Sequence, residues 1–276
     1  MGMHKETENV FDEQLSGHQV GAIGLEINTA HAKVSLVTEG DRRRARVRVF
    51  TRSTDLAVQQ AVTLSQIQLV DGTLTVYVPN ISRSSSNATV QNTGNAVAYG
   101  NGSVAVTGVV IGAMVNGVVF NNFGSGNVVN SVQDTHGVEV EIDLGVRNVD
   151  AKLSHSSLIV VGPLDLLKAK VSHGSLSTEV VDRLFVEASH SNVKAGMVTG
   201  QLDVQAPHCN VKVSKYRGQQ AKVNAPHSTV NFGIDRIASG DLDITANHGT
   251  VNVTGSKANP GVWVSTKASH GVVKTS

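Results

Sequence analysis

A histidine recurs every 17 to 22 residues through the second half of the chain, each time within the same local sequence. The residues four and two positions before it are mostly apolar, the next residue is small, and Leu or Val stands three positions after it. The repeated histidines are His155, His173, His190, His208, His227, His248 and His270. A unit of about 18 residues cannot bury its apolar face alone, so successive units must stack on one another.

Apolar positions alternate on both sides of each histidine, with a change of phase at the histidine itself. Alternation with a period of two is typical of a strand that has one buried face. Each unit therefore reads as strand, corner, strand, and the small residue after the histidine suits a tight corner. The sequence predicts an all-β fold, a parallel β-solenoid (β-helix) with rungs of about 18 residues paired about 4.8 Å apart.

Four segments are expected along the chain. Residues 1–18 read as a disordered tail, and residues 19–80 as an N-terminal β region that contains a related rung around His31. Residues 81–133 form a Gly/Asn/Val-rich insertion, and residues 134–276 carry the histidine-corner repeats. His136 lies one residue out of register with the repeat. Leu56 to Leu64 suits either a short helix or a strand.

The insertion has no charged residue or histidine between Ser84 and Gln133. Its glycines favour short strands or hairpins, because isolated glycines mark bends in strands. Two other interpretations remain open. The spacing of Gly108 and Gly112 also occurs in membrane helices, and the apolar run would equally suit a subunit interface.

The overall charge balances, with 23 Lys and Arg against 22 Asp and Glu. No general field would attract nucleic acid or an anionic membrane, so neither is expected as a partner. The single cysteine, Cys209, excludes an internal disulfide. The first 15 residues lack the apolar core of a secretory signal, which predicts a cytoplasmic protein.

Signatures of catalysis are scarce. The sequence has no phosphate-binding loop, no HExxH and no GxSxG motif. Some β-helices cleave polysaccharides with clustered acids. In this chain the acids are scattered, and the pair Asp241 and Asp243 is typical of a solvated strand face. We expect no enzyme, no catalytic residue and no cofactor, with a polysaccharide-acting enzyme as an alternative.

The histidines are the one repeated polar set, and stacked rungs would bring them about 4.8 Å apart. A structural column is the main interpretation, in which neutral rings pack on one another. Metal binding by the seven histidines named above is the first alternative, although a linear column offers only two imidazoles to each ion. A pH-sensing role is the second, because charged neighbours would repel each other.

Arginines gather on one predicted strand face, at Arg44, Arg46 and Arg48. A solvated face that protects a sheet edge from aggregation is the preferred interpretation. An anion or nucleic-acid site is the alternative.

The repeats resemble the bacterial putative-adhesin family of β-strand-repeat domains of unknown function. The likeness rests on Gly24-Leu-Glu-Ile-Asn28, on Leu74-Thr-Val-Tyr-Val-Pro79 and on repeats that read as Ser-Gly corners in the family; it covers Gln19 to Ser276. This chain departs from the pattern by placing a histidine between the two corner residues, as in Ser172-His173-Gly174. Relatives are often exported or surface-associated, and the family assigns no catalytic residues.

Together these features predict a non-enzymatic scaffold or adhesin-like interaction module. The expected partner is a protein or a glycan, and a homo-oligomer is an alternative. A metal-binding protein built on the histidine column is a further alternative.

Overall fold

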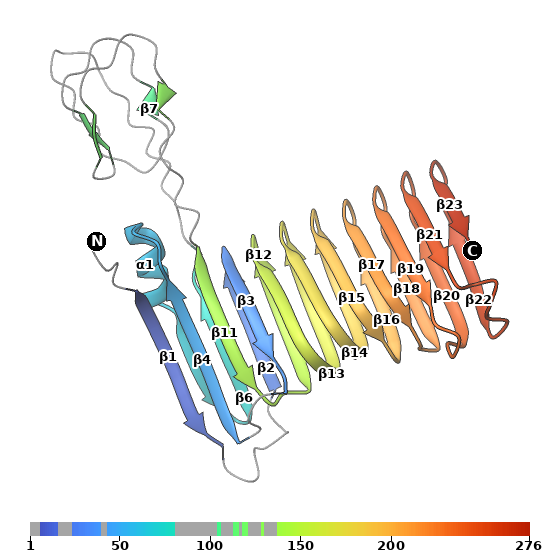
Figure 1. The fold of residues 1–276 in the computed structure, drawn as a ribbon, viewed down its shortest axis with the longest axis horizontal. Coiled ribbons are helices and arrows are strands. Elements are labelled where there is room, and N and C mark those ends of the chain that lie inside the picture. The colour runs from blue at the N-terminus through green and yellow to red at the C-terminus, as the bar shows by residue number, and fades with distance from the viewer. Residues whose placement is uncertain are drawn as a thin grey trace.

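The fold was described from a computed structural model, which places residues 6–15, 24–39, 43–80 and 137–276 together with the backbone of four short strands between residues 104 and 129. The predicted all-β parallel β-solenoid is confirmed: 67% of the residues that the structure describes are in strands, and about seven turns follow one another roughly 19 residues apart. Figure 1 shows the rungs side by side, with the N-terminal elements at one end and the C-terminus at the other.

Each turn contributes one strand before its histidine and one after it, so the solenoid has two faces. Face A contains the strands that precede the histidines, and each of them pairs with the next along the solenoid axis. In spatial order they are β5 (Gln66–Val70), β6 (Thr73–Val78), β2 (Gly24–Ala30), β12 (Asn148–Ser154), the second part of β13 (Ser157–Ser172), the second part of β14 (Ser175–Ser189), β16 (Gln201–Gln205), β18 (Gln220–Asn224), β20 (Gly240–Thr245) and β22 (Val262–Lys267).

Face B contains the strands that follow the histidines, which pair with one another in the same manner. In spatial order they are β1 (Thr7–Gln14), β4 (Arg44–Thr51), β11 (Val138–Leu144), β3 (Ala32–Val37), the first parts of β13 and β14, β15 (Asn192–Val198), β17 (Asn210–Tyr216), β19 (Thr229–Ile234), β21 (Thr250–Thr254) and β23 (Val272–Thr275). Within the two faces of the solenoid, all pairings are parallel except β1 with β4, β4 with β11 and β5 with β6.

The core lies between the two faces and runs the length of the solenoid. Along β17, Val211 and Val213 are buried while Lys212 is exposed. On face A, Val204 and Val223 occupy the equivalent inward positions of neighbouring strands and are also buried. Inward side chains therefore stack from rung to rung, as the period-two pattern predicts.

The segment β2–His31–β3 is a rung of the same solenoid although residues 38–147 separate it in the sequence from the next rung, which begins with β12. β2 pairs with β12, and β3 pairs with the first part of β13, both in parallel. On its other side β2 pairs with β6 and β3 pairs with β11. The N-terminal β region and the repeats thus share one continuous structure.

The N-terminal end differs from the expectation of a disordered tail. Residues Thr7–Gln14 form β1, so that prediction is wrong for this stretch. β1 pairs with β4, and its acidic residues meet the arginines of β4: Arg44 Nη2 donates to Asp12 Oδ2 at 2.7 Å, and Arg48 Nε donates to Glu8 Oε2 at 2.9 Å. The arginine face is therefore covered with carboxylates, and β1 rather than β4 ends the sheet.

Leu56–Thr63 forms the helix α1, which contacts β1, β4 and β11 at this end of the solenoid (Figure 1). Its N-cap residue, Asp55, accepts a hydrogen bond from the backbone N–H of Ala57 at 2.9 Å. Val58, Ala61 and Val62 are buried. The helix covers core side chains that an open end would expose.

Within the insertion, the described strands are β7 (Val104–Ala105), β8 (Ala113–Val115), β9 (Val118–Phe120) and β10 (Val128–Val129). β8 pairs with β9 and β7 with β10, both antiparallel. The rest of residues 81–133 and His136 lie outside the described residues. In the part of the chain that the structure describes, no helix has the length and apolar character needed to cross a bilayer.

Candidate binding groove along the histidine column

Eight histidine side chains stack into one column along an edge of the solenoid. The ring centroids of successive members are 4.5–5.1 Å apart, and adjacent ring planes differ by 1–16°. All eight side chains are exposed. In spatial order the histidine column contains His31, His155, His173, His190, His208, His227, His248 and His270.

The backbone explains why the corner residue is special. The histidines from His31 to His248 in the column have φ between 49° and 57°, the left-handed region. Residues with a Cβ rarely adopt it, and Asn, Asp and His do so more often than most. The corner thus selects a residue that tolerates this conformation, and the shared backbone geometry points these seven rings in the same direction.

Main-chain hydrogen bonds fix the spacing between successive corners. The N–H of His155 donates to the carbonyl of Ser172 at 2.8 Å, and the N–H of His208 donates to the carbonyl of Pro226 at 3.0 Å. In each case the acceptor is the residue before the next histidine of the column. The rings are therefore held about one strand spacing apart by the backbone.

The small residue after each histidine forms a second column beneath the rings. The hydroxyl of Ser228 accepts a hydrogen bond from the N–H of Cys209 at 2.9 Å, and the Sγ of Cys209 accepts one from the N–H of Ser191 at 3.3 Å. Burial raises the pKa of the Cys209 thiol. At Gly174 a side chain is excluded, because a Cβ would overlap the backbone carbonyl of Ser156. Small residues are needed in this column because neighbouring backbones approach closely.

Two shallow depressions follow one another beside the histidine column on face B, and together we call them the groove. On face B, the first outward-facing residue after each corner histidine from His155 to His248 has a short polar side chain. We call this row the polar strip: Ser157, Ser175, Asn192, Asn210, Thr229 and Thr250. Within it, Asn210 Nδ2 donates to Asn192 Oδ1 at 3.0 Å. The groove therefore has imidazoles on one side, small corner residues at its floor and hydroxyls and amides on the other side.

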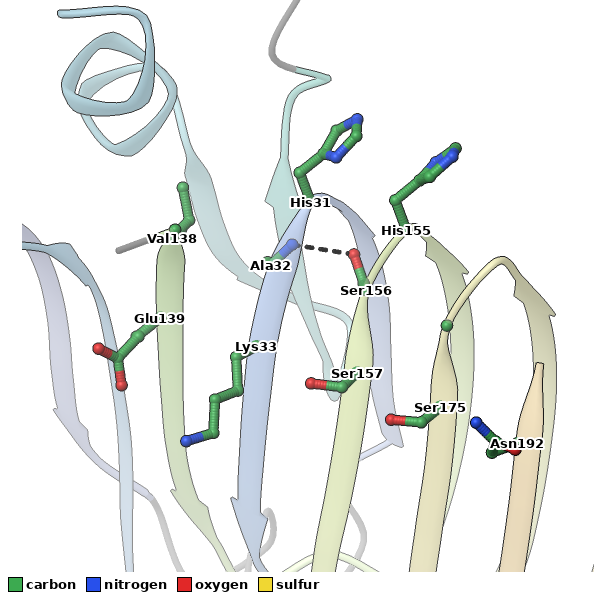
Figure 2. Close-up of a pocket in the computed structure, with 12 residues that line it drawn as sticks. His31, Ala32, Lys33, Val138, Glu139, His155, Ser156, Ser157, Ser175 and Asn192 are labelled. Carbon is green, nitrogen blue, oxygen red and sulfur yellow. Dashed lines mark hydrogen bonds between the residues drawn. The ribbon is translucent and has the colours of Figure 1, made fainter. Parts of the chain in front are cut away.

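The two depressions of the groove have volumes of about 610 Å³ and 450 Å³. The first includes His31, His155 and the start of the polar strip, and the second includes His208 to His270. Figure 2 shows the first: His31 and His155 project from the corner, and Ser157, Ser175 and Asn192 follow one another across the strands. A dashed line marks the 3.0 Å hydrogen bond from Ala32 N–H to Ser156 Oγ.

Chelation of one metal ion by neighbouring rings is poorly supported by this geometry. Because the ring planes are nearly parallel, the nitrogen lone pairs of neighbouring rings point in parallel directions and do not converge. A tetrahedral site needs ligands that converge at about 2.0–2.1 Å from one ion. Among the described residues, no group of three or more His, Cys, Asp or Glu side chains is placed to hold a metal ion.

The acidic residues that catalysis would need are spread along the solenoid, and some of them form ion pairs with arginines. Asp165 accepts from Arg147 at 3.0 Å, and Asp235 accepts from Arg217 at 2.9 Å, which lowers the pKa of the Asp235 carboxyl. Asp241 and Asp243 lie on the outward side of β20 on face A, away from the groove. The structure does not bring these carboxylates to one point.

Sequence reasoning identified the seven repeated histidines and the rung of His31. It did not identify the left-handed corner, the hydrogen-bonded column of small residues or the polar strip. The polar strip could have been found by assigning each strand residue to a face, because its members all stand two positions after a corner histidine. The left-handed conformation gives no comparable periodic signal.

No family model and no curated protein matches the sequence. Solved structures resemble it over nearly its whole length. A putative adhesin from Bacteroides fragilis has 12% identity and a TM-score of 0.48, covering 98% of this chain and 97% of that one. A putative adhesin from Parabacteroides merdae has 12% identity and a TM-score of 0.42, covering 98% and 96%. A putative cell adhesion protein from Clostridium sporogenes has 13% identity and a TM-score of 0.35, covering 98% and 99%. All three of these solved structures are described as putative adhesins or as a putative cell adhesion protein.

Proposed function

We propose that this protein is a non-enzymatic interaction module that binds an extended polymer along the groove beside the histidine column. The observation that carries the proposal is the regular column itself, with exposed rings at seven consecutive intervals of 4.5–5.1 Å. A stack of rungs presents the same side chains again and again, and such rows suit extended partners.

The shape of the groove supports a polymer rather than a small molecule. Small-molecule sites are concave pockets that bury most of the ligand's surface. The two depressions of this groove are shallow and lie along the solenoid axis, one including His31 and His155 and the other including His208 to His270. A chain lying in this groove would meet the polar strip on one side and the imidazole edges on the other.

The repetition also favours binding over catalysis. Acid–base catalysis needs groups whose environments differ, so that one donates and another accepts a proton. The seven histidines from His31 to His248 have nearly the same backbone conformation, and all eight rings of the column are exposed. Equivalent groups at regular intervals supply many similar contacts to one long ligand.

The proposal is tested by placing a bulky side chain in the groove. Polymer binding by this variant is compared with that of a variant carrying the same substitution on the opposite face. Asn210 in the polar strip donates to Asn192 at 3.0 Å, and Asn224 on face A donates to Gln205 at 3.0 Å. Both residues are exposed. Asn210→Trp and Asn224→Trp thus each remove one equivalent ladder hydrogen bond and add the same bulk.

The two variants and the unchanged protein would be probed on an array of linear glycans and extended polypeptides. We expect Asn210→Trp to lose binding to the polymers that the unchanged protein retains, and Asn224→Trp to keep it. Equal binding by both variants, or no polymer bound by the unchanged protein, would contradict the proposal. Thermal melts of both variants check that each one folds.

A further inference from the structure

The two faces of the solenoid differ in charge. In the part of the chain that the structure describes, the face B strands β15, β17, β19, β21 and β23 contain no Asp or Glu. The outward positions of face A beside them include Glu187, Asp203, Asp241 and Asp243. From β15 to β23 the groove therefore borders an acid-free surface, whereas the opposite face carries carboxylates, together with Lys222 and Lys267.

Four exposed lysines lie on this acid-free surface, Lys194, Lys212, Lys215 and Lys274, and the first two form a pair next to the polar strip. Lys194 on β15 and Lys212 on β17 are partners in the parallel register, and each stands two positions beyond an asparagine of the polar strip. Both are exposed, and within the described residues neither forms an ion pair. Two like charges on adjacent strands repel each other unless an anion lies between or above them.

From this arrangement we infer that the polymer bound in the groove is an acidic polysaccharide that carries carboxylates along its length. This inference rests on the proposed function and names its ligand class. The lysines attract the carboxylates on one side, and the hydroxyls and amides of the polar strip hydrogen-bond the sugar hydroxyls. The imidazole edges contact the chain from the other side.

The charges around the histidine column are mostly positive. Lys33 and Glu139 line the groove at its N-terminal end. The nearest charges outside it are Lys194, Lys212 and Lys274 on face B and, on face A, Lys152, Lys170, Glu187 and Lys267. Positive side chains thus outnumber negative ones beside the groove, which favours an anionic ligand.

A nucleic acid fits the groove less well than an acidic glycan. Proteins that bind single strands stack the bases on the faces of aromatic side chains. The residues that line the two depressions include no Phe, Tyr or Trp. The faces of the interior imidazoles are covered by the neighbouring rings of the column, which leaves their edges for hydrogen bonds.

The need for charge on the ligand is tested with one polymer in two forms. Polygalacturonate carries carboxylates, and its fully methyl-esterified derivative does not. Lys194→Gln/Lys212→Gln removes two positive charges beside the groove. Lys152→Gln/Lys170→Gln removes two from partner positions on face A, and is the matched control. We expect the unchanged protein to prefer the charged polymer, and the face B variant alone to bind it about five- to tenfold more weakly, as the loss of two exposed charge contacts implies.

The role of the histidines is tested by replacing His190, His208 and His227 with Asn, which also tolerates the left-handed conformation. The triple variant should bind polygalacturonate about five- to tenfold more weakly, because it lacks three of the imidazole edges that contact the polymer. A triple variant that folds, as thermal melts show, and binds as tightly as the unchanged protein would overturn the assignment to the column.

The possible failures can be told apart. Equal binding of the charged and esterified polymers, or equal loss in both lysine variants, overturns the inference of an acidic ligand but leaves a polymer-binding groove. Equally tight binding of single-stranded DNA shows a general polyanion site and overturns the assignment to a glycan. Binding of no polymer to the unchanged protein overturns the proposed function itself.

Discussion

The backbone N–H of Cys209 donates a 2.9 Å hydrogen bond to the hydroxyl of Ser228 on the next rung, and both residues are buried. The same hydroxyl lies 2.9 Å from both the carbonyl of Ala206 and the carbonyl of Pro226, which share its single proton. This one side chain therefore satisfies polar groups of two rungs directly beneath the histidine column.

Replacing Ser228 with Ala should destabilise the protein by about 1–3 kcal/mol, because it leaves the buried N–H of Cys209 without an acceptor. Ser214 lies exposed on face B and provides the control. Ser214→Ala should change the free energy of unfolding by less than about 0.5 kcal/mol. Urea denaturation measures both, and equal values would contradict the role assigned to the small-residue column.

The left-handed corner conformation predicts which residues can replace His227, whose φ is 56°. His227→Asn should be nearly neutral, whereas His227→Val should cost about 1–2 kcal/mol or more, because a β-branched residue fits the left-handed region poorly. Asn231→Val, at an exposed strand position of the same rung, controls for the added apolar surface. Thermal melts measure the stability of each variant. Equal losses for valine at positions 227 and 231 would contradict a special role of the left-handed backbone at His227.

The assignment of inward and outward faces is tested at two neighbouring residues of β17. Val211 is 1% exposed, while Lys212 points outward. Val211→Asp should cost several kcal/mol, because it places an unpaired carboxylate between stacked rungs. Lys212→Asp should leave the melting temperature almost unchanged. Similar losses in the two variants would mean that the faces are wrongly assigned.

The sequence predicts the solenoid well because its strongest signals are local and repeated. Val204, Val211 and Val223 each follow from alternation within their own strands, and all three are buried. The same reasoning places the small residue after each histidine at a close approach between rungs. Features that depend on one unit repeating in register can therefore be found without coordinates.

Features that depend on distant partners could not be found in this way. The segment Thr7–Gln14 is polar and looks disordered by itself, but Glu8 and Asp12 pair with Arg48 and Arg44 on β4. The charge difference between the faces also emerges only when every strand is assigned to a face. The left-handed corner is a backbone property that the residue type permits but does not specify.

The buried Tyr216 predicts a loss of stability at high pH. Burial raises its pKa from 10.0 to about 12, and its hydroxyl donates to the carbonyl of Gly200 at 3.2 Å. Between these two values the unfolded chain releases the phenolic proton while the folded protein keeps it, so the unfolded state is favoured as the pH rises. This part of the stability is complete below about pH 10 and is lost as the pH approaches 12.

Tyr216→Phe removes the titrating group and leaves the ring in the core, at a cost of about 1 kcal/mol for the lost hydrogen bond at neutral pH. Denaturation followed by circular dichroism from pH 8 to pH 11.5 should show a steeper fall for the unchanged protein than for the variant. Deprotonation of the lysines affects both proteins equally, so the difference between the two curves isolates Tyr216. Parallel curves would show that this hydroxyl is open to solvent and that the rung around Gly200 does not enclose it.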